Sequence, residues 1–507
     1  MARYPNILLI TSDQHHPGVL GLVNPRVRTP ALDRLCGEGV RFDRAYTCNP
    51  TCTPARASIL TGMYPSQHGA WSLGTRLFED VPTLGDLLQR QGYRTSLVGK
   101  AHFQPLASQP GMESIECQPR LRELDFWRSF HGPWYGFQQV ETARMHAAES
   151  HAGGHYAVWM EERGLSHWRD YFETWPPDPR RRQQLYADRS WDLPQEFHYT
   201  TWTGERTIAH IRAAQQQGRP FFLWSSFHDP HPPYLVPEPW ASMYDPADMI
   251  PGRLDPDEHA RNPEHFGHTQ DADNRWWQQV REGEGAVHGG HPQRVDDTTL
   301  RRNMAVYYGM VSFMDQQIGS VLAELDRLGL TDDTLVVFTT DHGHFLGEHG
   351  LTAKAIHMYE ELIRLPFIVR WPGRVPAGQV SSHLQNLVDL APTFLAAAGL
   401  PVPGAMTGVN QLDDWCGGAA ARTWSVTENH HGYRRFHMRT YVDDRHKLTV
   451  YRTGNDGELF DLLEDPGEVR NLWHEPAAQA LKGRLLGAFM QATLQSEPER
   501  MPRLAGA

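Results

Sequence analysis

The sequence predicts an α/β fold: a large, mostly parallel β-sheet sandwiched by helices, followed by a small C-terminal subdomain with an antiparallel sheet. Two patterns predict it. Short apolar, β-rich runs alternate with segments of helical periodicity up to about residue 400, and short strands separated by turns follow. Hydrophobic residues make up 40% of the 507 residues and charged residues 21%, which excludes disordered, collagenous and coiled-coil chains.

Four apolar runs are predicted to be strands of the large sheet, and each leads into residues that carry chemistry. They cover residues 6–11, 95–98, 220–224 and 335–339. The residues that follow them are, in order, Asp13-Gln14, Lys100 with His102, His228 to His231, and Asp341-His342. Because ligands of open α/β sheets bind beyond the carboxyl ends of strands, we expect these four ends to form one shared site.

Helices are expected over residues 83–92, 203–217 and 298–329. Two long polar stretches interrupt the pattern, residues 104–199 and 237–297, both rich in Trp, His, Pro and Arg. Connections of that length are usually functional loops or lids, and small satellite cores under long loops are the alternative. We assign residues 1–418 to a catalytic α/β domain that carries these two insertions.

The C-terminal part begins after an apolar helix expected over residues 389–399 and a loop that reaches residue 418. Strands are predicted over residues 423–427, 436–442, 447–451 and 458–461, with a terminal helix beyond Glu475. We therefore assign residues 419–507 to a small antiparallel-sheet subdomain.

The charge of the chain limits the classes of partner it can bind, and its cysteine content indicates its cellular compartment. Asp and Glu total 60 against 48 Lys and Arg, a net charge of -12, which argues against nucleic acid as a partner. Five scattered cysteines do not suit a disulfide framework. The first residues lack the pattern of a signal peptide, and no run reaches the roughly 18 apolar residues of a membrane span. We expect a cytoplasmic protein without membrane association.

Cys52 lies just before a predicted helix that Pro54 can initiate and Gly62 can close. The free N–H groups and dipole of a helix N-terminus attract anions, and Arg56 one turn later would help to hold a tetrahedral oxyanion over the Cys52 side chain. A low-pKa thiolate nucleophile and a buried structural cysteine both fit this placement.

The segment Cys52-Thr-Pro-Ala-Arg56, followed by Thr61-Gly62, resembles the signature of type I sulfatases of the alkaline phosphatase superfamily. In that family the Cys of Cys-x-Pro-x-Arg is oxidised to Cα-formylglycine. Further motifs follow in family order from residue 6 to about 472: Asp13-Gln14, Gly99-Lys100-Ala-His102, His228-Asp-Pro-His231, Asp341-His342-Gly343, Lys354 and Glu458 to Leu472. Each motif alone is weak, but the ordered set is specific. The resemblance implies the family fold, a sulfuric ester hydrolase, and a formylglycine-generating enzyme as maturation partner.

The resemblance also implies one divalent metal ion, held by Asp13, Gln14, Asp341, His342 and the modified Cys52. Oxygen donors from carboxylates and an amide suit calcium, whereas manganese and zinc bind the imidazole nitrogen of His342 more readily than calcium does. We expect calcium, with manganese as the alternative.

In the implied mechanism, the aldehyde at residue 52 hydrates and attacks sulfur in line, which gives a covalent sulfo-enzyme. His231 gives the leaving ester oxygen a proton, Lys354 lies near that oxygen, and His102 takes a proton as sulfate is expelled. Taken alone, each histidine would be read as a structural residue. Their order along the chain with the Cys52 motif favours the catalytic interpretation.

Arg56 and Lys100 are implied to hold the residue 52 hydrate and the sulfate oxygens. The chain has only four Lys (Lys100, Lys354, Lys447 and Lys482) among its 48 basic residues. Lys can give up a proton where Arg cannot, and two of the four fall at family active-site positions. Other histidines, such as His344, His349 and His357, are interpreted as supporting or structural residues.

Three alternatives remain open. Phosphonate monoester or phosphodiester hydrolases of the same superfamily share the Asp-Gln and Asp-His pattern, although Lys100 and His102 favour a sulfatase. A nonhydrolytic anion- or sugar-binding protein would keep Cys52 as a thiol. A cysteine hydrolase would use the Cys52 thiolate and leave the metal residues unexplained.

The predicted substrate is a small sulfate ester, sugar or aryl, because the net negative charge disfavours a sulfated polymer. The pocket rim is expected to include the two insertions and the region of His430, His431 and Arg434. Leu73 stands where many relatives carry an Asn near the sulfate pocket, which leaves the local anion contacts open.

Overall fold

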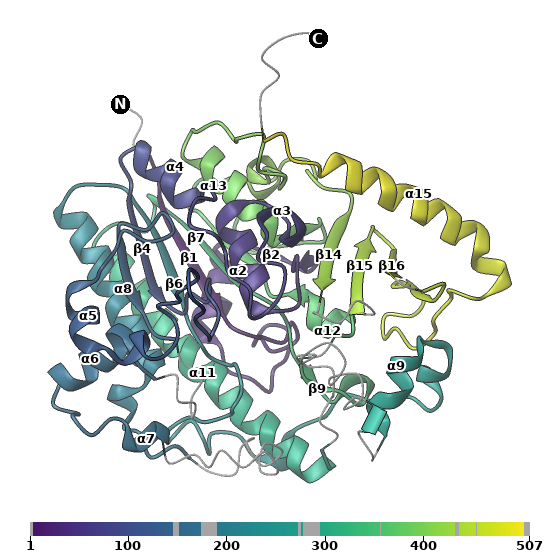
Figure 1. The fold of residues 1–507 in the computed structure, drawn as a ribbon, viewed down its shortest axis with the longest axis horizontal. Coiled ribbons are helices and arrows are strands. Elements are labelled where there is room, and N and C mark those ends of the chain that lie inside the picture. Colours follow the sequence, from purple (N-terminus) through teal and green to yellow (C-terminus); the bar gives the residue numbers. More distant parts are fainter. Residues whose placement is uncertain are drawn as a thin grey trace, which may run out of the picture.

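A computed structural model describes residues 4–144, 152–173, 190–271, 275–276, 295–354, 356–430, 436–452 and 454–500. At its centre lies an eight-stranded sheet in the order β12-β2-β11-β7-β1-β6-β4-β5 (Figure 1). Five adjacent strands are parallel: β7 (Thr334–Thr340), β1 (Asn6–Ser12), β6 (Phe221–Ser226), β4 (Arg94–Gly99) and β5 (Gln139–Thr142). The predicted fold class is confirmed, with four of these strands at their expected places.

The other three strands make the sheet mixed. β11 (Ile368–Arg370) runs antiparallel to both β7 and β2 (Val40–Phe42), and β12 (Gln379–Ser381) pairs parallel with β2. β5 lies within the first long insertion, for which the sequence predicts a functional loop or lid and no strand of the large sheet. Its Gln-Val-Glu-Thr sequence carries little apolar signal because β5 is an edge strand that buries only alternate residues.

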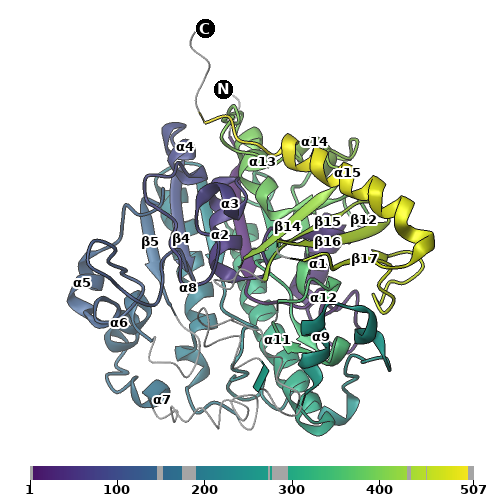
Figure 2. The ribbon, with the colours of Figure 1, turned by 45° about the vertical axis from the view of Figure 1, so that its right-hand side comes forward.

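Both faces of the sheet are buried, as expected for parallel strands. Leu8 and Ile10 of β1 share one apolar cluster with α1 (Pro30–Glu38), α8 (Tyr199–Gln216) and α11 (Asp297–Arg327). Ile7 and Leu9 point to the opposite face, where α2 (Cys52–Thr61), α4 (Leu84–Arg90) and α13 (Leu390–Ala397) pack. Figure 2 shows these two helical layers with the strands between them.

The insertions hold small cores of their own. α5 (Leu124–Ser129), α6 (Gly154–Glu162) and α7 (Asp170–Glu173) belong to the first insertion, where aromatic residues such as Tyr156 and Trp168 form a satellite cluster with Trp202 of α8. α9 (Glu264–Gly267) belongs to the second. The remaining short elements are β3 (Ala45–Tyr46), α3 (Pro65–His68), β8 (Phe345–Leu346), β9 (Thr352–Ala353), α12 (Glu360–Ile363), β10 (Arg364–Leu365), β13 (Gln385–Asn386) and α14 (Leu412–Trp415).

The C-terminal sheet is antiparallel and consists of β14 (Ser425–His430), β15 (His437–Val442), β16 (His446–Tyr451) and β17 (Gly457–Asp461). α15 (Gln479–Gln495) covers it, with Phe489 packed 5.7 Å from the Tyr441 ring. Leu448 and Phe489 belong to the same apolar cluster as Ile7. The division at residue 418 stays a prediction. Within the described ranges, no helix has both the length and the apolar character needed to cross a membrane.

Candidate active site

The four predicted strand ends meet at one edge of the large sheet. β7, β1, β6 and β4 are consecutive in the sheet, so the residues that follow them come together. Asp13 N–H donates to the Asp229 carbonyl, Gln14 N–H donates to the Asp341 side chain, and Lys100 N–H donates to the Ser226 carbonyl. These contacts link all four ends into one site.

β4 and β6 approach each other closely where the site begins. Gly99 has φ +100°, and a Cβ there would lie 1.9 Å from the Ser226 carbonyl oxygen. Only glycine tolerates both this backbone conformation and this contact. The close approach places the next residue, Lys100, beneath the site with its side chain fully buried.

Cys52 is the first residue of α2, whose ten residues are all buried. Pro54 fits the third helical position because the first N–H groups of a helix have no intrahelical partner. Gly62 ends the helix in the left-handed region, and its N–H donates to the Ser58 carbonyl at 2.9 Å. The helix thereby presents its N-terminus and the Cys52 thiol to the strand ends.

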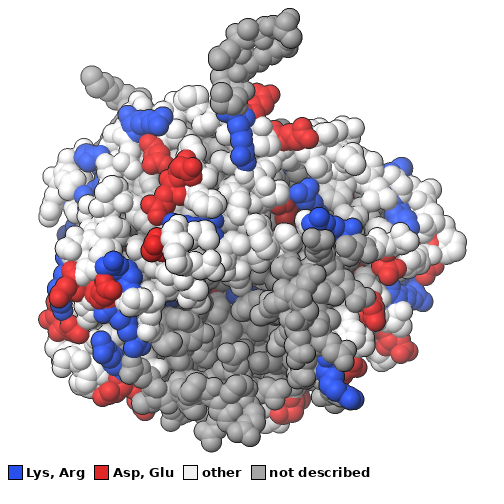
Figure 3. Space-filling view, viewed as in Figure 1, with Lys and Arg blue, Asp and Glu red and all other residues white. Residues whose placement is uncertain are grey.

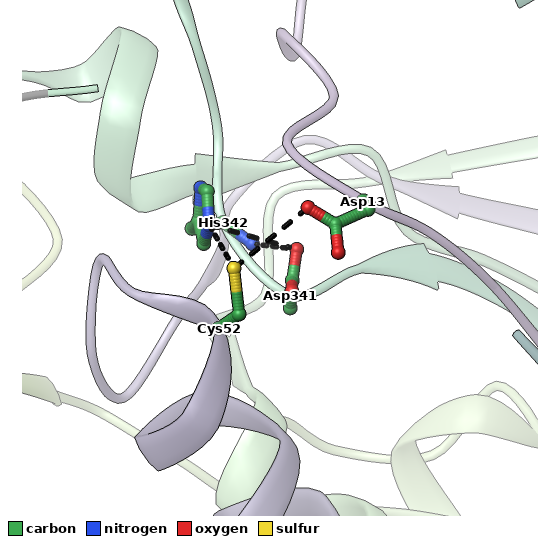
Figure 4. A group of neighbouring side chains, drawn as sticks. All are labelled: Asp13, Cys52, Asp341 and His342. Carbon is green, nitrogen blue, oxygen red and sulfur yellow. Dashed lines mark hydrogen bonds and ion pairs between the residues drawn. The ribbon is translucent and has the colours of Figure 1, made fainter. Parts of the chain in front are cut away.

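Asp13, Cys52, Asp341 and His342 bring one ligand atom each within 4.8 Å of one another, and all four are buried (Figure 4). The Cys52 Sγ lies 3.8 Å from Asp13 Oδ1 and 3.3 Å from His342 Nε2. This is the only such group among the residues that the structure describes. Two carboxylates, an imidazole and a sulfur in this arrangement can hold a divalent cation.

Two further observations show that the donor set fits a metal ion. His342 Nδ1 donates to the Gly343 carbonyl at 3.0 Å, so the lone pair of the neutral ring is on Nε2, which faces the group. Gln14 Nε2 donates to His344 Nδ1 at 2.9 Å, while the buried Gln14 Oε1 has no hydrogen-bond partner. A buried amide oxygen without a partner is costly unless it coordinates a cation or accepts a hydrogen bond from water.

Two lysines lie beside the Cys52 thiol. Lys354 Nζ is 3.2 Å and Lys100 Nζ 3.7 Å from Sγ, and Lys100 also forms an ion pair with Asp13. Burial and the Asp13 carboxylate act to raise the pKa of the Cys52 thiol, but the two ammonium groups outweigh them and the pKa is lowered. The site therefore stabilises negative charge at residue 52.

Arg56 holds the acidic side of the site together. Its Nε donates to Asp341 Oδ2 and its Nη2 to Asp13 Oδ2, both at 3.0 Å, and its Nη1 donates to the Lys100 carbonyl and to Ser226 Oγ. The guanidinium lies between the two carboxylates, whose buried charges would be costly without a cationic partner. The predicted role of Arg56 in holding an oxyanion over residue 52 stays a prediction.

The two predicted catalytic histidines lie at neighbouring strand ends. His231 Nδ1 donates to the Pro232 carbonyl, and its Nε2 lies 3.3 Å from Lys354 Nζ. His102 is buried with φ +58°, and burial followed by the charges of Arg144 and Lys100 holds its pKa well below the usual value. His231 and Lys354 thus share one side of Cys52.

Several supporting residues carried little sequence signal. Thr47 donates to the Asp341 carbonyl at 2.7 Å, and Tyr307 donates to the Gln14 carbonyl at 2.9 Å. His344, interpreted from sequence as a supporting residue, takes that role through Gln14. The signal for His344 was its position two residues after His342 in a strand-end motif.

Of the predicted rim residues, His430 stacks on Trp71 with ring centroids 4.1 Å apart, and Leu73 is half-buried in the same loop as Trp71. His431 and Arg434 lie outside the described residues. The rim interpretation stays a prediction.

Comparisons with known proteins agree with this geometry. The sulfatase family model matches residues 5–400, and the model for the C-terminal part of N-sulphoglucosamine sulphohydrolase matches residues 347–495. The chain is 30% identical to the multifunctional alkaline phosphatase superfamily protein PehA of Trinickia caryophylli, covering 94% of this chain and 92% of that protein. It is 28% identical to an arylsulfatase of Clostridium perfringens, covering 92% and 90%.

Among solved structures, the phosphonate monoester hydrolase SpPMH from Silicibacter pomeroyi has a TM-score of 0.77 and 26% identity, covering 98% of this chain and 96% of that one. Fold, site and relatives together define a sulfuric ester hydrolase with an alkaline phosphatase-like fold. The chain belongs to the sulfatase family.

Proposed function

We propose that this enzyme hydrolyses a small sulfate monoester to an alcohol and inorganic sulfate, with residue 52 as formylglycine and one divalent metal ion. One observation carries the proposal: Cys52 Sγ is part of the buried group with Asp13, Asp341 and His342, and it also lies 3.7 and 3.2 Å from the ammonium groups of Lys100 and Lys354. A nucleophile beside a cation site and two fixed positive charges suits attack on an anionic ester.

Asp13, Gln14, Asp341 and His342 would hold the metal ion together with residue 52, and calcium is the ion we favour over manganese. When bound, the ion supplies positive charge that acidifies the nucleophile and stabilises charge on the sulfate oxygens. Arg56 keeps both carboxylates in place through its bonds to Asp13 and Asp341. Gln14 is held by His344 through its Nε2, which leaves the buried Oε1 without a hydrogen-bond partner and available to the ion.

An aldehyde at residue 52 supplies, as its hydrate, an oxygen nucleophile at the place of the thiol sulfur. Lys100 binds a sulfate oxygen on the Asp13 side of the site. Lys354 and His231 lie together on another side and serve the leaving oxygen, with His231 as its proton donor. We assign to His102 the role of base, which accepts the proton from residue 52 as sulfate departs.

A second candidate activity is the hydrolysis of phosphonate monoesters or phosphate diesters. The similarity to the phosphonate monoester hydrolase, at 26% identity over nearly the whole chain, favours it specifically. A sulfate monoester and a phosphate diester each carry one negative charge, so the same cationic groups would bind either. Lys100 and His102 favour the sulfate ester as the preferred substrate.

The proposed substrate is a sugar or aryl sulfate rather than a long sulfated polymer. The chain carries a net charge of -12, and on the face shown in Figure 3 acidic and basic side chains are interspersed in small groups. Such a surface offers little steering to a polyanion. We place the enzyme in the cytoplasm, and its five free cysteines agree with this proposal. We also propose a formylglycine-generating enzyme as its maturation partner.

The test begins with the mass of the tryptic peptide 45–56 from protein co-expressed with a formylglycine-generating enzyme. Cys48 in the same peptide is the internal thiol control, because it is buried and its pKa is raised to about 12. We expect an aldehyde at residue 52 and a thiol at residue 48. An unmodified Cys52, with the maturation enzyme active on a control peptide, would move the assignment to a thiolate hydrolase or a binding protein.

The substrate is tested next by comparing kcat/KM for an aryl sulfate, a monosaccharide sulfate, a sulfated polymer, an aryl phosphonate monoester and a phosphate diester. We expect a sulfate monoester to be turned over best. A higher kcat/KM for the phosphonate or the diester would establish the second candidate as the main activity, and preference for the polymer would refute the small-substrate proposal.

A further inference from the structure

Glu116, from the first insertion, binds the backbone turn that carries His102. Its Oε1 accepts the His102 N–H and its Oε2 accepts the Gln104 N–H, both at 2.7 Å. A third bond joins the same two segments, because the Gln104 Oε1 accepts the Ile115 N–H at 2.9 Å. These reciprocal bonds, here called the Glu116 clasp, join residues 102–104 to residues 114–116.

The clasp is buried, and one cationic side chain lies near it. Glu116, Gln104 and His102 are all buried. Arg144, which follows β5 and is itself buried, places Nε 3.9 Å from Glu116 Oε1. A carboxylate that accepts two backbone N–H groups at this length makes strong, charge-assisted bonds. Leaving those N–H groups buried without an acceptor would be costly.

The turn needs such an anchor because His102 has φ +58°, a conformation that non-glycine residues rarely adopt. A left-handed residue persists at a functional site only where surrounding contacts fix it. Lys100 and Ala101 link the turn to β4, and the two Glu116 bonds fix its other side. The direction of the His102 ring therefore depends on a residue of the insertion.

We propose that Glu116 is a positioning residue for His102: its carboxylate holds the left-handed turn that sets the direction of the imidazole. The proposal rests on the proposed function for the role of His102, but its geometric part stands independently. In this proposal the first insertion does more than line a pocket, because one of its residues fixes the position of His102.

The experiment is a double-mutant cycle with Glu116→Gln and His102→Ala, assayed on the preferred ester. A glutamine keeps the shape but offers an NH2 group to one of the two N–H donors. With His102 present, we expect Glu116→Gln to lower kcat about 10- to 100-fold and to change KM less than about 3-fold. In the His102→Ala background, the same substitution should change kcat less than about 2-fold.

Glu113→Gln is the matched control, because Glu113 is exposed on the same loop and its side chain accepts the Gly111 N–H of its own turn. We expect it to leave kcat unchanged. Equal losses from Glu116→Gln in both backgrounds would overturn the proposal, since Glu116 would then act independently of His102. If Glu116→Gln does not fold, Gln104→Ala loosens the clasp from its other side and replaces it in the same cycle.

Crystal structures separate this proposal from the proposed function. If the wild-type enzyme turns over none of the esters, the proposed function fails, but the geometry is still tested. We expect His102 to leave the left-handed region in the Glu116→Gln structure and to keep it in the Glu113→Gln structure. A His102 φ that stays near +58° in Glu116→Gln would refute the positioning role.

Discussion

His349 should be a strong and pH-dependent contributor to stability. Its Nδ1 lies 3.0 Å from Glu258 Oε1 and its Nε2 3.5 Å from Glu361 Oε2, and its ring stacks on Tyr359 with centroids 3.5 Å apart. Burial opposes the charged ring, but the two carboxylates raise the pKa of His349 to about 10. This buried imidazolium joins the second insertion to the segment that leads to Lys354.

The perturbation is His349→Gln. A pKa shift from 6.5 to about 10 corresponds to roughly 4–5 kcal/mol, and removing one partner of a buried ion pair costs about 3–5 kcal/mol. We therefore expect the free energy of unfolding at pH 6.5 to fall by about 3–5 kcal/mol. Glu258 and Glu361 would remain near each other without a cation between them.

The sign of the pH dependence follows from the raised pKa. The folded protein binds a proton at His349 that the unfolded chain releases above about pH 6.5, so the stabilisation is complete below that pH and is lost as the pH rises toward 10. The stability difference between wild type and His349→Gln should shrink by about 1.4 kcal/mol per pH unit between pH 7 and 9.5.

The assay is urea unfolding followed by tryptophan fluorescence at several pH values. The control is His474→Gln, because His474 pairs with Asp456 at 3.1 Å but both side chains are more than 60% exposed. We expect that control to change stability by less than about 0.5 kcal/mol, with no such slope. A His349→Gln difference that is below about 1 kcal/mol, or constant across the pH range, would falsify the reasoning.

Three further substitutions test the site. Lys354→Ala should lower kcat about 100- to 1,000-fold without unfolding the protein, measured by steady-state kinetics and circular dichroism; a loss below about 3-fold would argue against contact with the reacting group. Asp341→Asn should weaken divalent-cation binding at least about 10-fold in calorimetry, and unchanged affinity would place the ion elsewhere. Gly99→Ala should lower stability by about 3 kcal/mol or more, because the new Cβ would lie 1.9 Å from the Ser226 carbonyl oxygen; an unchanged melting temperature would contradict the close approach of β4 and β6.

Much of the fold could be predicted from the sequence because its signals are local. The apolar runs that became β1, β4, β6 and β7 are continuous, since parallel strands are buried on both faces. β5 was missed because an edge strand of four residues with three polar side chains carries little apolar signal. The chemistry at the strand ends was also readable, because motif residues stand directly after each strand.

The sequence by itself determined the fold class, the order of the strand-end motifs and the Cys52 signature, all of which depend on residues close together in the chain. Only the tertiary structure decided that Arg56 binds the two carboxylates, that Gln14 Oε1 is buried without a hydrogen-bond partner, and that Glu116 accepts the His102 N–H. Each of these contacts depends on how separate elements pack. Hydrogen bonds between elements are set by packing geometry at the scale of an ångström, which no local pattern of residue types specifies.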